Sequence, residues 1–377
     1  MIKNTLKNKG KSLKLTTLGF TLIELLAVIV ILAIIALIAT PIILNIIKDS
    51  KIESIKRSAE NYLDAVEQAL VRRNITEEFK PATCTIISTG LNCNGYSEPL
   101  KIDIDGKIST TGTIKFDNSM VSKGTTFILD NYIISVNDDN KITIKPYTEP
   151  KSFATDSWQT IVDNIRLGNL EKYNVGDSKS ISGSKFAFTK ARIVNTSTPN
   201  VCNDKNFSQT ACGFVLEFEY ILKNDVIMTR TGTNENGWKD SFIKKYLISE
   251  ILYDLSDELE EFIIDTLVVS GYSKEYNNEN FYTTDKLYLL SPKEIYGITP
   301  EGDTLTQTRQ LDYYNKEKVS IENFSKASKK YNGNNSEYWL RSPLQNLNGF
   351  FTVASDGSLV DFDADFELGL SLAFRIG

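Results

Sequence analysis

Histidine is absent from this 377-residue chain, and its four cysteines stand in two close pairs. Without histidine, Ser-His-Asp catalysis, Cys-His catalysis and histidine-ligated metal sites are excluded by residue supply alone. The pairs Cys84/Cys93 and Cys202/Cys212 lack the two-residue spacing of zinc knuckles and thioredoxin-type motifs. Residues 25–47 carry no charge and could direct the chain to a membrane. For an exported chain we predict two short-loop disulfides, with four unpaired thiols as the alternative. Pairing by proximity is one of three possible connectivities, and no metal or cofactor is expected.

Glu24 is the second candidate for chemistry, because it stands at the entrance of 23 uncharged residues, 25–47. An ionisable group at the edge of a membrane segment needs a partner. Cleavage after Gly19 would free an amine on Phe20, and a positive charge of a neighbouring subunit could then neutralise the carboxylate. A lone carboxylate is costly in an apolar bundle, so this pairing would favour one packing register between subunits. The alternative is that Glu24 rests among lipid headgroups, at the end of a plain anchor.

Three further side chains, Trp238, Trp339 and Arg341, are candidates for a surface that recognises a ligand. The alternative is that they are core and buttress residues of the fold. Segment 361–367, DFDADFE, places three aspartates on one face if extended and could hold calcium. It lacks the glycine and distal glutamate of a calcium loop, which favours an exposed acidic edge strand. Segment 103–107, DIDGK, favours a hairpin turn over a calcium loop for the same reason.

The charge distribution separates an N-terminal leader from the rest of the chain. Residues 1–19 contain five lysines and no acidic residue. Removing these five positive charges from the net charge of −6 leaves −11 for the remainder. A positive leader before an apolar run predicts that the N-terminus stays cytoplasmic and the bulk of the chain is exported. The acidic body has no basic stripe interleaved with aromatic residues, so no nucleic acid partner is expected.

The stretch 19–41, GFTLIELLAVIVILAIIALIATP, resembles the class III signal of type IV prepilins and pseudopilins. Gly19 matches the residue before the cleaved bond, and Phe20 matches the usually N-methylated first residue of the mature chain. Glu24 matches the fifth residue after the cut, and Pro41 matches a helix-bending proline. The resemblance implies that a prepilin peptidase, an aspartyl membrane protease, removes residues 1–19. It also implies assembly with other pilin subunits into a helical filament with the apolar helices at its core.

A single long helix over residues 20–75 is the element expected to carry this signal. Residues 25–47 would span roughly 35 Å as a helix, enough to cross a hydrocarbon core of about 30 Å. Pro41 should kink the helix or melt it locally without ending it. Beyond the apolar run, three- and four-residue steps predict an amphipathic second half that packs on the globular part. The apolar positions are Ile52, Ile55, Ala59, Tyr62, Val66 and Ala69.

Two globular units are expected after the helix, and the whole chain is predicted to be of the α+β class. Within residues 76–147, apolar and polar residues alternate in Lys101–Ile104 and again in Ile142–Ile144, and turn signals stand at Asp105-Gly106 and Asp139-Asn140. This predicts strands of a small antiparallel sheet, similar to a pilin head. The segment 145–152, with two prolines and no periodicity, marks the boundary to residues 148–377. There we expect a short helix ending near Gly168, strands in 185–195 and 212–222, and two helices within 237–268 with a cap at Asp240 or Ser241.

Residues 173–377 resemble a domain of uncharacterised function that is common in surface and exported proteins of Gram-positive bacteria. Its fold is similar to the C-type-lectin-like core shared with formylglycine-generating enzymes. Those enzymes use a reactive cysteine pair with copper, whereas Cys202 and Cys212 lie in a polar loop where we expect a structural disulfide. The chain also departs from the usual GVRPAF-like run at residues 369–374, GLSLAF. The matching motifs are YNVGD (173–177), NGWKDSFIKKYL (236–247), DKLYLLSPKEIYG (285–297), EYWLRSP (337–343) and LSLAFRIG (370–377).

Together these features predict an exported, membrane-inserted pilin-like subunit, with the membrane span at 25–47. Its size suggests a minor or tip-like subunit whose C-terminal domain binds a glycan or a surface protein. The expected partners are the prepilin peptidase, other pilin subunits and membrane lipid before assembly. One alternative is a pseudopilin of a secretion or DNA-uptake machine. Another is a membrane-tethered enzyme, against which the lack of histidine and of any nucleophile constellation counts; we expect no enzymatic activity.

Overall fold

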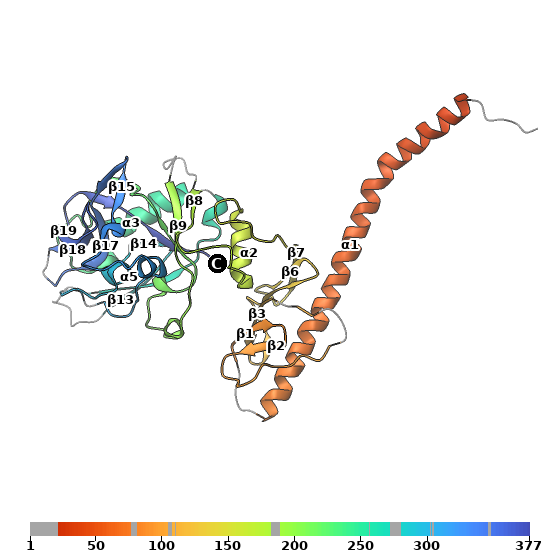
Figure 1. Cartoon of the computed structure of the whole chain (residues 1–377), viewed down its shortest axis with the longest axis horizontal. Coiled ribbons are helices and arrows are strands. Elements are labelled where there is room, and N and C mark those ends of the chain that lie inside the picture. The colour runs from red at the N-terminus through yellow and green to blue at the C-terminus, as the bar shows by residue number, and fades with distance from the viewer. Residues whose placement is uncertain are drawn as a thin grey trace, which may run out of the picture. The chain divides into compact units, whose positions relative to one another are not determined.

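The computed structural model describes residues 22–76, 81–104, 108–109, 111–181, 189–255, 257–271, 280–301, 303, 305–345 and 348–377. By its contacts the chain divides into residues 1–60 and 61–377. The predicted boundaries at 75/76 and 147/148 stay predictions. The described chain is mixed α+β, with a long N-terminal helix followed by β-rich parts, as the sequence predicted (Figure 1).

The N-terminal helix α1 extends from Leu22 to Thr76 without interruption, which confirms the single long helix. Pro41 lies inside it, so the proline does not end the helix. One residue earlier, the Thr40 hydroxyl donates a hydrogen bond of 2.6 Å to the carbonyl of Ala36. Such bonding to the backbone four residues back is common for threonine in helices.

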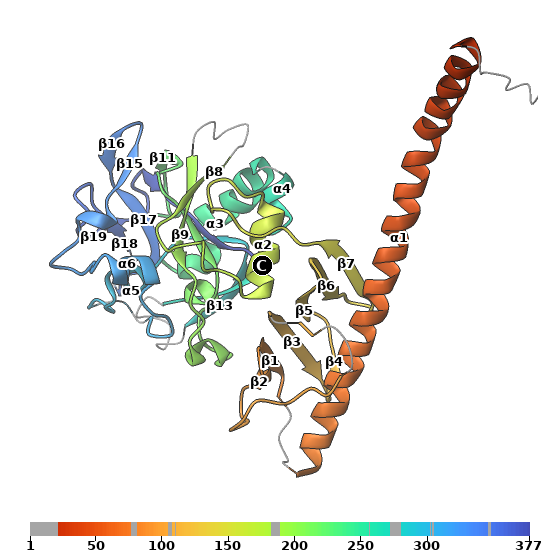
Figure 2. The same cartoon turned by 45° about the vertical axis from the view of Figure 1, so that its right-hand side comes forward.

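The last turns of α1, beyond residue 60, are amphipathic and pack on a sheet (Figure 2). Tyr62 and Val66 are fully buried, as the apolar stripe predicted, and the ring of Tyr62 lies 5.2 Å from that of Phe127. The Glu67 carboxylate accepts a hydrogen bond of 2.7 Å from the backbone N–H of Val121. Burial of one face and this polar contact together attach the end of the helix to the sheet.

The sheet that follows α1 is antiparallel, with seven strands among the described residues. The order is β2-β1-β3-β5-β6-β7, and β4 pairs with β3. Cys84 and Cys93 are direct cross-strand partners on β1 and β2, and they form a disulfide. The predicted turn at Asp139-Asn140 joins β6 to β7, and Asn140 has a left-handed φ of 56°. The strands are β1 (Thr83–Ile87), β2 (Gly90–Cys93), β3 (Gly112–Asp117), β4 (Met120–Val121), β5 (Thr126–Leu129), β6 (Tyr132–Val136) and β7 (Ile142–Pro146).

The prediction of a strand at Lys101–Ile104 is wrong, because these residues are in irregular conformation. Leu100 exchanges two backbone hydrogen bonds with Leu91, of 2.7 and 2.9 Å, and the pairing with β2 ends there. Alternation of apolar and polar residues does not form a strand where no neighbouring strand continues the ladder. The predicted turn at Asp105-Gly106 lies outside the described residues.

In the C-terminal part, the first helix forms as its local signals predict. Helix α2 comprises Trp158–Leu167; the Ser157 hydroxyl accepts a hydrogen bond from the Thr160 N–H, and Gly168 ends the helix with a left-handed φ of 73°. Strand β9 (Thr189–Asn195) confirms the first predicted strand where the structure describes it. Strand β10 (Val215–Phe218) confirms only the middle of the second, predicted at 212–222.

The predicted pair of helices within 237–268 is only partly correct. A 3-10 turn, η3 (Gly237–Asp240), leads into α3 (Phe242–Tyr246), which Ser241 caps as predicted. The helix continues as π and 3-10 turns to Asp254 and resumes as α4 (Asp257–Glu260). Residues 266–268, expected to be helical, belong to strand β12 (Thr266–Ser270), which pairs along its whole length with β13 (Phe281–Asp285). Long-range pairing decides the structure of such short apolar runs.

Two five-stranded sheets dominate the C-terminal part, and both mix strands from distant sequence positions. The orders are β14-β21-β10-β9-β8 and β11-β20-β17-β18-β19, and β17 and β20 are parallel neighbours. Every residue of β17 and β18 is buried. The remaining strands are β8 (Ser178–Ile181), β11 (Lys223–Val226), β13 (Phe281–Asp285), β14 (Leu287–Tyr288), β15 (Lys329–Tyr331), β16 (Asn334–Ser336), β17 (Tyr338–Pro343), β18 (Gly349–Val353), β19 (Leu359–Asp363), β20 (Leu368–Leu370) and β21 (Ala373–Arg375).

Short helices connect these strands, and one of them carries a local signal that the sequence interpretation overlooked. Helix α5 (Pro292–Tyr296) begins at a capping box, in which Ser291 and Glu294 satisfy each other's backbone N–H groups. Helix α6 (Asp312–Lys316) and the 3-10 turns η1 (Asn200–Asn203), η2 (Gln209–Ala211) and η6 (Ser325–Ala327) complete the described elements.

Candidate functional site

The first half of α1 is the first candidate, because it is apolar and exposed. From Leu22 to Ile47 its one charged residue is Glu24, in the first helical turn. The apolar side chains lie open, with Leu22 82% exposed and Leu37 77% exposed. The helix is long and apolar enough to span a membrane. Gly19 and Phe20, the predicted cleavage and methylation site, lie outside the described residues.

The predicted ligand surface on Trp238, Trp339 and Arg341 is wrong, because all three side chains are completely buried. The indole N–H of Trp238 donates to Asp285 Oδ2 at 2.9 Å, and that of Trp339 donates to the Val226 carbonyl at 2.7 Å. Buried tryptophans with satisfied N–H groups are core residues. The alternative interpretation, that these residues support the fold, is therefore confirmed.

Arg341 forms a bidentate ion pair with Glu294 inside the core. Nη1 and Nη2 lie 2.5 and 2.6 Å from the two carboxylate oxygens, and neither side chain is exposed. The hydroxyls of Thr210 and Thr308 also donate to this carboxylate. Burial alone raises the pKa of Glu294, but Arg341 and the hydroxyl and backbone donors hold it below its usual range. The fully satisfied pair joins α5 to β17 and leaves no group for a ligand.

A second buried network surrounds Glu217 on β10. Its carboxylate contacts Lys329 Nζ at 2.7 Å, Arg192 Nη2 at 2.5 Å and the Tyr314 hydroxyl at 2.9 Å. Burial raises the pKa of Glu217, but Lys329 and Arg192 hold it below its usual range. Lys329 also donates to the hydroxyl of Ser371. Glu217, Lys329 and Tyr314 are buried and Arg192 is only 13% exposed, so the network links these elements and offers no accessible nucleophile or base.

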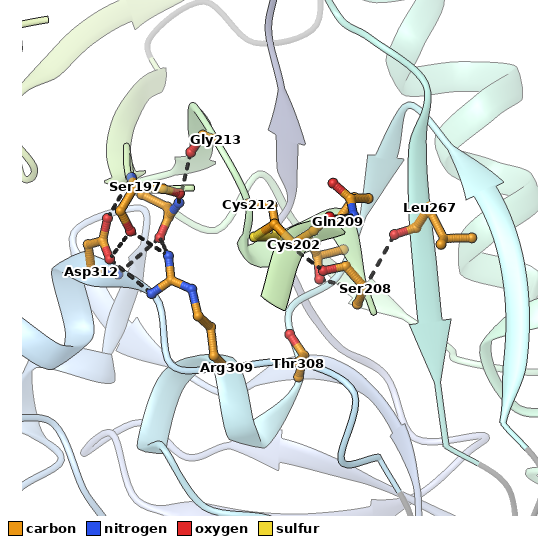
Figure 3. Close-up of a disulfide and its surroundings, with 12 residues drawn as sticks. Ser197, Cys202, Ser208, Gln209, Cys212, Gly213, Leu267, Thr308, Arg309 and Asp312 are labelled. Carbon is orange, nitrogen blue, oxygen red and sulfur yellow. Dashed lines mark hydrogen bonds and ion pairs between the residues drawn. A yellow bond between two sulfur atoms is a disulfide. The ribbon is translucent and has the colours of Figure 1, made fainter. Parts of the chain in front are cut away.

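The disulfide Cys202–Cys212 closes a loop that further contacts tie to the domain (Figure 3). The backbone N–H of Ser208 donates to the Gln307 carbonyl at 2.8 Å, and the Ser208 hydroxyl accepts from the Val269 N–H at 3.1 Å. Cys212 is 1% exposed. Both predicted pairings, Cys84–Cys93 and Cys202–Cys212, are thus confirmed, and this one has the anchored setting of a structural bridge.

Polar side chains fix the base of the same loop, at one side of the view in Figure 3. Arg309 donates to Asn195, Ser197 and Asp312 at 2.6, 2.6 and 3.0 Å. The Asp312 carboxylate also accepts from the backbone N–H groups of Thr196 and Ser197. Burial raises the pKa of Asp312, but these donors hold it below its usual range. The charges of Arg309 and Asp312 pair with each other, which again indicates a structural role.

The acidic segment 361–367 lies partly on β19, an edge strand of its sheet. Asp361, Asp363 and Asp365 are exposed. Within the described ranges, no group of three or more acidic or cysteine side chains converges as a metal site would require. The structure thus agrees with the acidic edge strand, which exposed charges protect from pairing with other chains.

An open groove of about 440 Å³ lies between loop 229–236 and the start of α3. The hydroxyls of Thr231 and Thr233 and the amide of Asn236 line one part. Charged side chains and the half-exposed ring of Phe242 line the rest. The volume falls within the range of small-ligand sites.

The loop that forms the groove is held at several points. Its first residue, Thr229, donates its backbone N–H to the Ala364 carbonyl at 3.0 Å and its hydroxyl to the Thr233 carbonyl at 2.8 Å. The buried amide of Asn234 donates to the carbonyls of Leu344 and Gly349 at 2.9 and 2.7 Å. A groove whose walls are fixed by such contacts is pre-organised for a ligand.

The comparisons with known proteins concern the part of the chain that contains the groove. Residues 214–376 match the family model described as "Domain of unknown function (DUF6273)". No curated protein and no solved structure matches the chain. The matched segment runs from β10 to β21, so it includes the groove and the buried residues Trp238, Trp339 and Arg341, whereas Cys202 and Cys212 precede it.

The sequence interpretation missed the groove, because its lining residues form no motif. They are spread over residues 229–245 and become neighbours only when the loop folds back on α3. The available signal was the polar run TRTGTNEN (229–236), whose Gly232 and Asn236 adopt left-handed φ angles of 66° and 64°. Polar loops held by a rigid domain often carry binding residues.

Proposed function

We propose that the chain is a type IV pilin-like subunit, minor or tip-like, which a prepilin peptidase matures and which enters a surface filament through α1. In this proposal residues 1–19 are removed, Phe20 becomes the methylated N-terminus, and the C-terminal domain binds a ligand outside the cell. The chain would be held in the membrane by residues 25–47 before assembly, with its bulk outside. It would not act as an enzyme.

The observation that carries the proposal is the exposed apolar half of α1, with one carboxylate at its start. Soluble domains rarely expose so extended an apolar surface, and residues 22–40 and 43–47 present one in which Glu24 is the only charged residue. Lipid or the apolar helices of other subunits would cover it. The order of leader, Gly19, Phe20, Glu24 and Pro41 adds the resemblance to class III signals.

The role proposed for Glu24 is to select the depth at which an incoming subunit packs. In an apolar bundle, a carboxylate is tolerated where a positive charge lies beside it. The amine that cleavage creates on Phe20 of a neighbouring subunit would supply this charge. Subunits packed one helical turn away from that register would leave the carboxylate beside apolar side chains.

Three features of the chain bear on its place in a filament and on the alternatives. The 302 residues of 76–377 would crowd a filament if present at every position, which favours a minor or tip-like place. The acidic body argues against direct DNA binding in an uptake machine, whereas a pseudopilin of a secretion machine remains the second candidate. For a membrane-tethered enzyme, the sequence supplies no histidine, and the buried charges described above satisfy one another.

The test of assembly compares Glu24→Ala with Glu53→Ala in a cell that assembles type IV filaments. Glu53 lies on the same helix and is exposed beyond the apolar run. Both variants should insert in the membrane at the wild-type level. Glu24→Ala should be lost from sheared filaments, while Glu53→Ala should be retained. Wild-type recovery of Glu24→Ala in filaments would contradict the role of the charge.

A further inference from the structure

The groove between loop 229–236 and α3 holds charged side chains that do not neutralise one another. Arg230, Asp240 and Lys245 line it, and all three are exposed. Among the residues that the structure describes, no ion pair or side-chain hydrogen bond involves any of the three. Glu235, the fourth charged lining residue, has a partner of its own. The lining thus carries two positive and two negative side chains, and of these Arg230, Lys245 and Asp240 stay available to a ligand.

Arg230 is held in position by a contact that leaves its hydrogen-bond donors unused. Its Cζ lies 4.5 Å from the centroid of the Phe242 ring. Phe242 stacks on Tyr246, one helical turn along α3, at 6.2 Å, and Lys223 Nζ lies 4.9 Å from the Tyr246 ring. A cation over an aromatic face is restrained without using its N–H groups. The guanidinium lines the groove with these N–H groups available, and its planar fork is suited to a carboxylate.

The other lining groups are suited to hydroxyl groups. The hydroxyls of Thr231 and Thr233 and the amide of Asn236 can each donate and accept, and the Asp240 carboxylate can accept. A ligand with several hydroxyls and one negative charge would match both features. A polyanion would meet repulsion from Asp240, and an uncharged sugar would leave Arg230 and Lys245 without a partner.

We propose that this groove binds a saccharide that carries a carboxylate, with Arg230 and Lys245 at the carboxylate and Asp240 and Asn236 at ring hydroxyls. The inference rests on the proposed function, in which the C-terminal domain binds a ligand outside the cell. It adds the place and the chemical class of that ligand. The fixed loop and the stacked arginine mean that the site needs little rearrangement to bind.

The test applies the full-length chain, in lipid nanodiscs, to an array of glycans that carry uronic acids, sialic acids, phosphate, sulfate or no charge. Binding to carboxylated glycans is expected. Affinity would then be measured for a bound carboxylated oligosaccharide and for its uncharged counterpart. The uncharged counterpart should bind at least tenfold more weakly, because charged hydrogen bonds are lost.

Variants decide whether the groove is the site. Arg230→Gln should weaken binding roughly tenfold or more, and Arg230→Lys should restore it in part, because the charge returns without the fork. Lys239→Gln is the matched control: it removes one positive charge from η3, but Lys239 lies over the ring of Phe281 and does not line the groove. Tryptophan fluorescence should be unchanged in all three, since Arg230 and Lys239 are exposed.

Three results would overturn the inference: no binding to any carboxylated glycan, equal binding to uncharged glycans, or unchanged affinity of Arg230→Gln. Preferred binding to phosphorylated or sulfated glycans would also overturn it. The same Arg230→Gln chain should enter filaments at the wild-type level. Normal filament entry without glycan binding would refute this inference alone, whereas glycan binding without filament entry would refute the proposed assembly alone.

Discussion

Replacement of Arg341 by methionine tests whether this residue supports the fold or serves a ligand. Methionine keeps an unbranched apolar stem but removes both hydrogen bonds to Glu294, which are 2.5 and 2.6 Å long. It also removes the donors to the carbonyls of Val269 and Leu289. Removing one partner of a buried ion pair costs about 3–5 kcal/mol, because the other charge stays buried without compensation.

The cost should depend on pH, because Glu294 can escape its unpaired charge by taking up a proton. With an ordinary glutamate pKa of 4.5, protonation costs about 3.4 kcal/mol at pH 7 and about 0.7 kcal/mol at pH 5. The destabilisation by Arg341→Met should therefore be smaller at pH 5 than at pH 7, by about 2–3 kcal/mol. Adding Glu294→Gln removes the charge, so the double variant should lose this difference.

The assay is urea unfolding of the full chain in detergent micelles, followed by tryptophan fluorescence. All three tryptophans, Trp158, Trp238 and Trp339, lie in the C-terminal part, so the signal reports its unfolding. Lys205→Met, at an exposed lysine of the C-terminal part, is the control and should change the unfolding free energy by less than about 0.5 kcal/mol. A cost for Arg341→Met below about 1 kcal/mol at pH 7, or an equal cost at both pH values, would refute the reasoning.

Three further predictions concern stability. Burial raises the pKa of Asp303 from 3.8 to about 6. The contribution of Asp303 to the free energy of unfolding is therefore complete below pH 3.8 and is lost as the pH rises through 6. Asp303→Asn should thus stabilise the domain above pH 6, by up to about 3 kcal/mol, and have little effect at pH 4 in urea titrations; equal effects at both pH values would contradict this. Replacing Cys202 and Cys212 together by serine should cost about 2–3 kcal/mol in the same titration, because the unfolded chain gains freedom, and an unchanged midpoint would argue against a stabilising bridge. Tyr62→Ala should cost about 3 kcal/mol and expose residues 81–147 to limited proteolysis, whereas Asp64→Ala on the exposed face should not; identical cleavage of both variants would contradict the packing of α1 on the sheet.

Local signals predicted those elements whose ends are set by the adjacent side chains. Ser157 and Gly168 define α2 from within the segment itself, and Ser241 does the same for α3. The long run of apolar residues likewise identified α1 without information from the rest of the chain.

Elements that depend on distant partners were not predictable in the same way. Thr266–Ser270 is apolar enough for a helix and becomes a strand because β13 pairs with it. Lys101–Ile104 alternates like a strand and has no ladder to continue. The partner of Arg341 also escaped prediction, since Glu294 lies 47 residues away in the sequence.

The candidate sites show the same difference between residues recognised within one segment and residues brought together by folding. Glu24 and Pro41 were identified from their spacing within one segment. The groove required the folded loop, because the contact of Arg230 with Phe242 joins residues on different elements. A binding surface without a motif becomes visible only when the side chains that line it are placed in three dimensions.

Maturation of the N-terminus tests the central claim most directly. The full-length chain would be expressed with a prepilin peptidase, and the mass of its N-terminal peptide would be determined. The account predicts a mature chain that begins at Phe20 and carries an N-methyl group. An intact leader, or cleavage at a bond other than Gly19–Phe20, would contradict it.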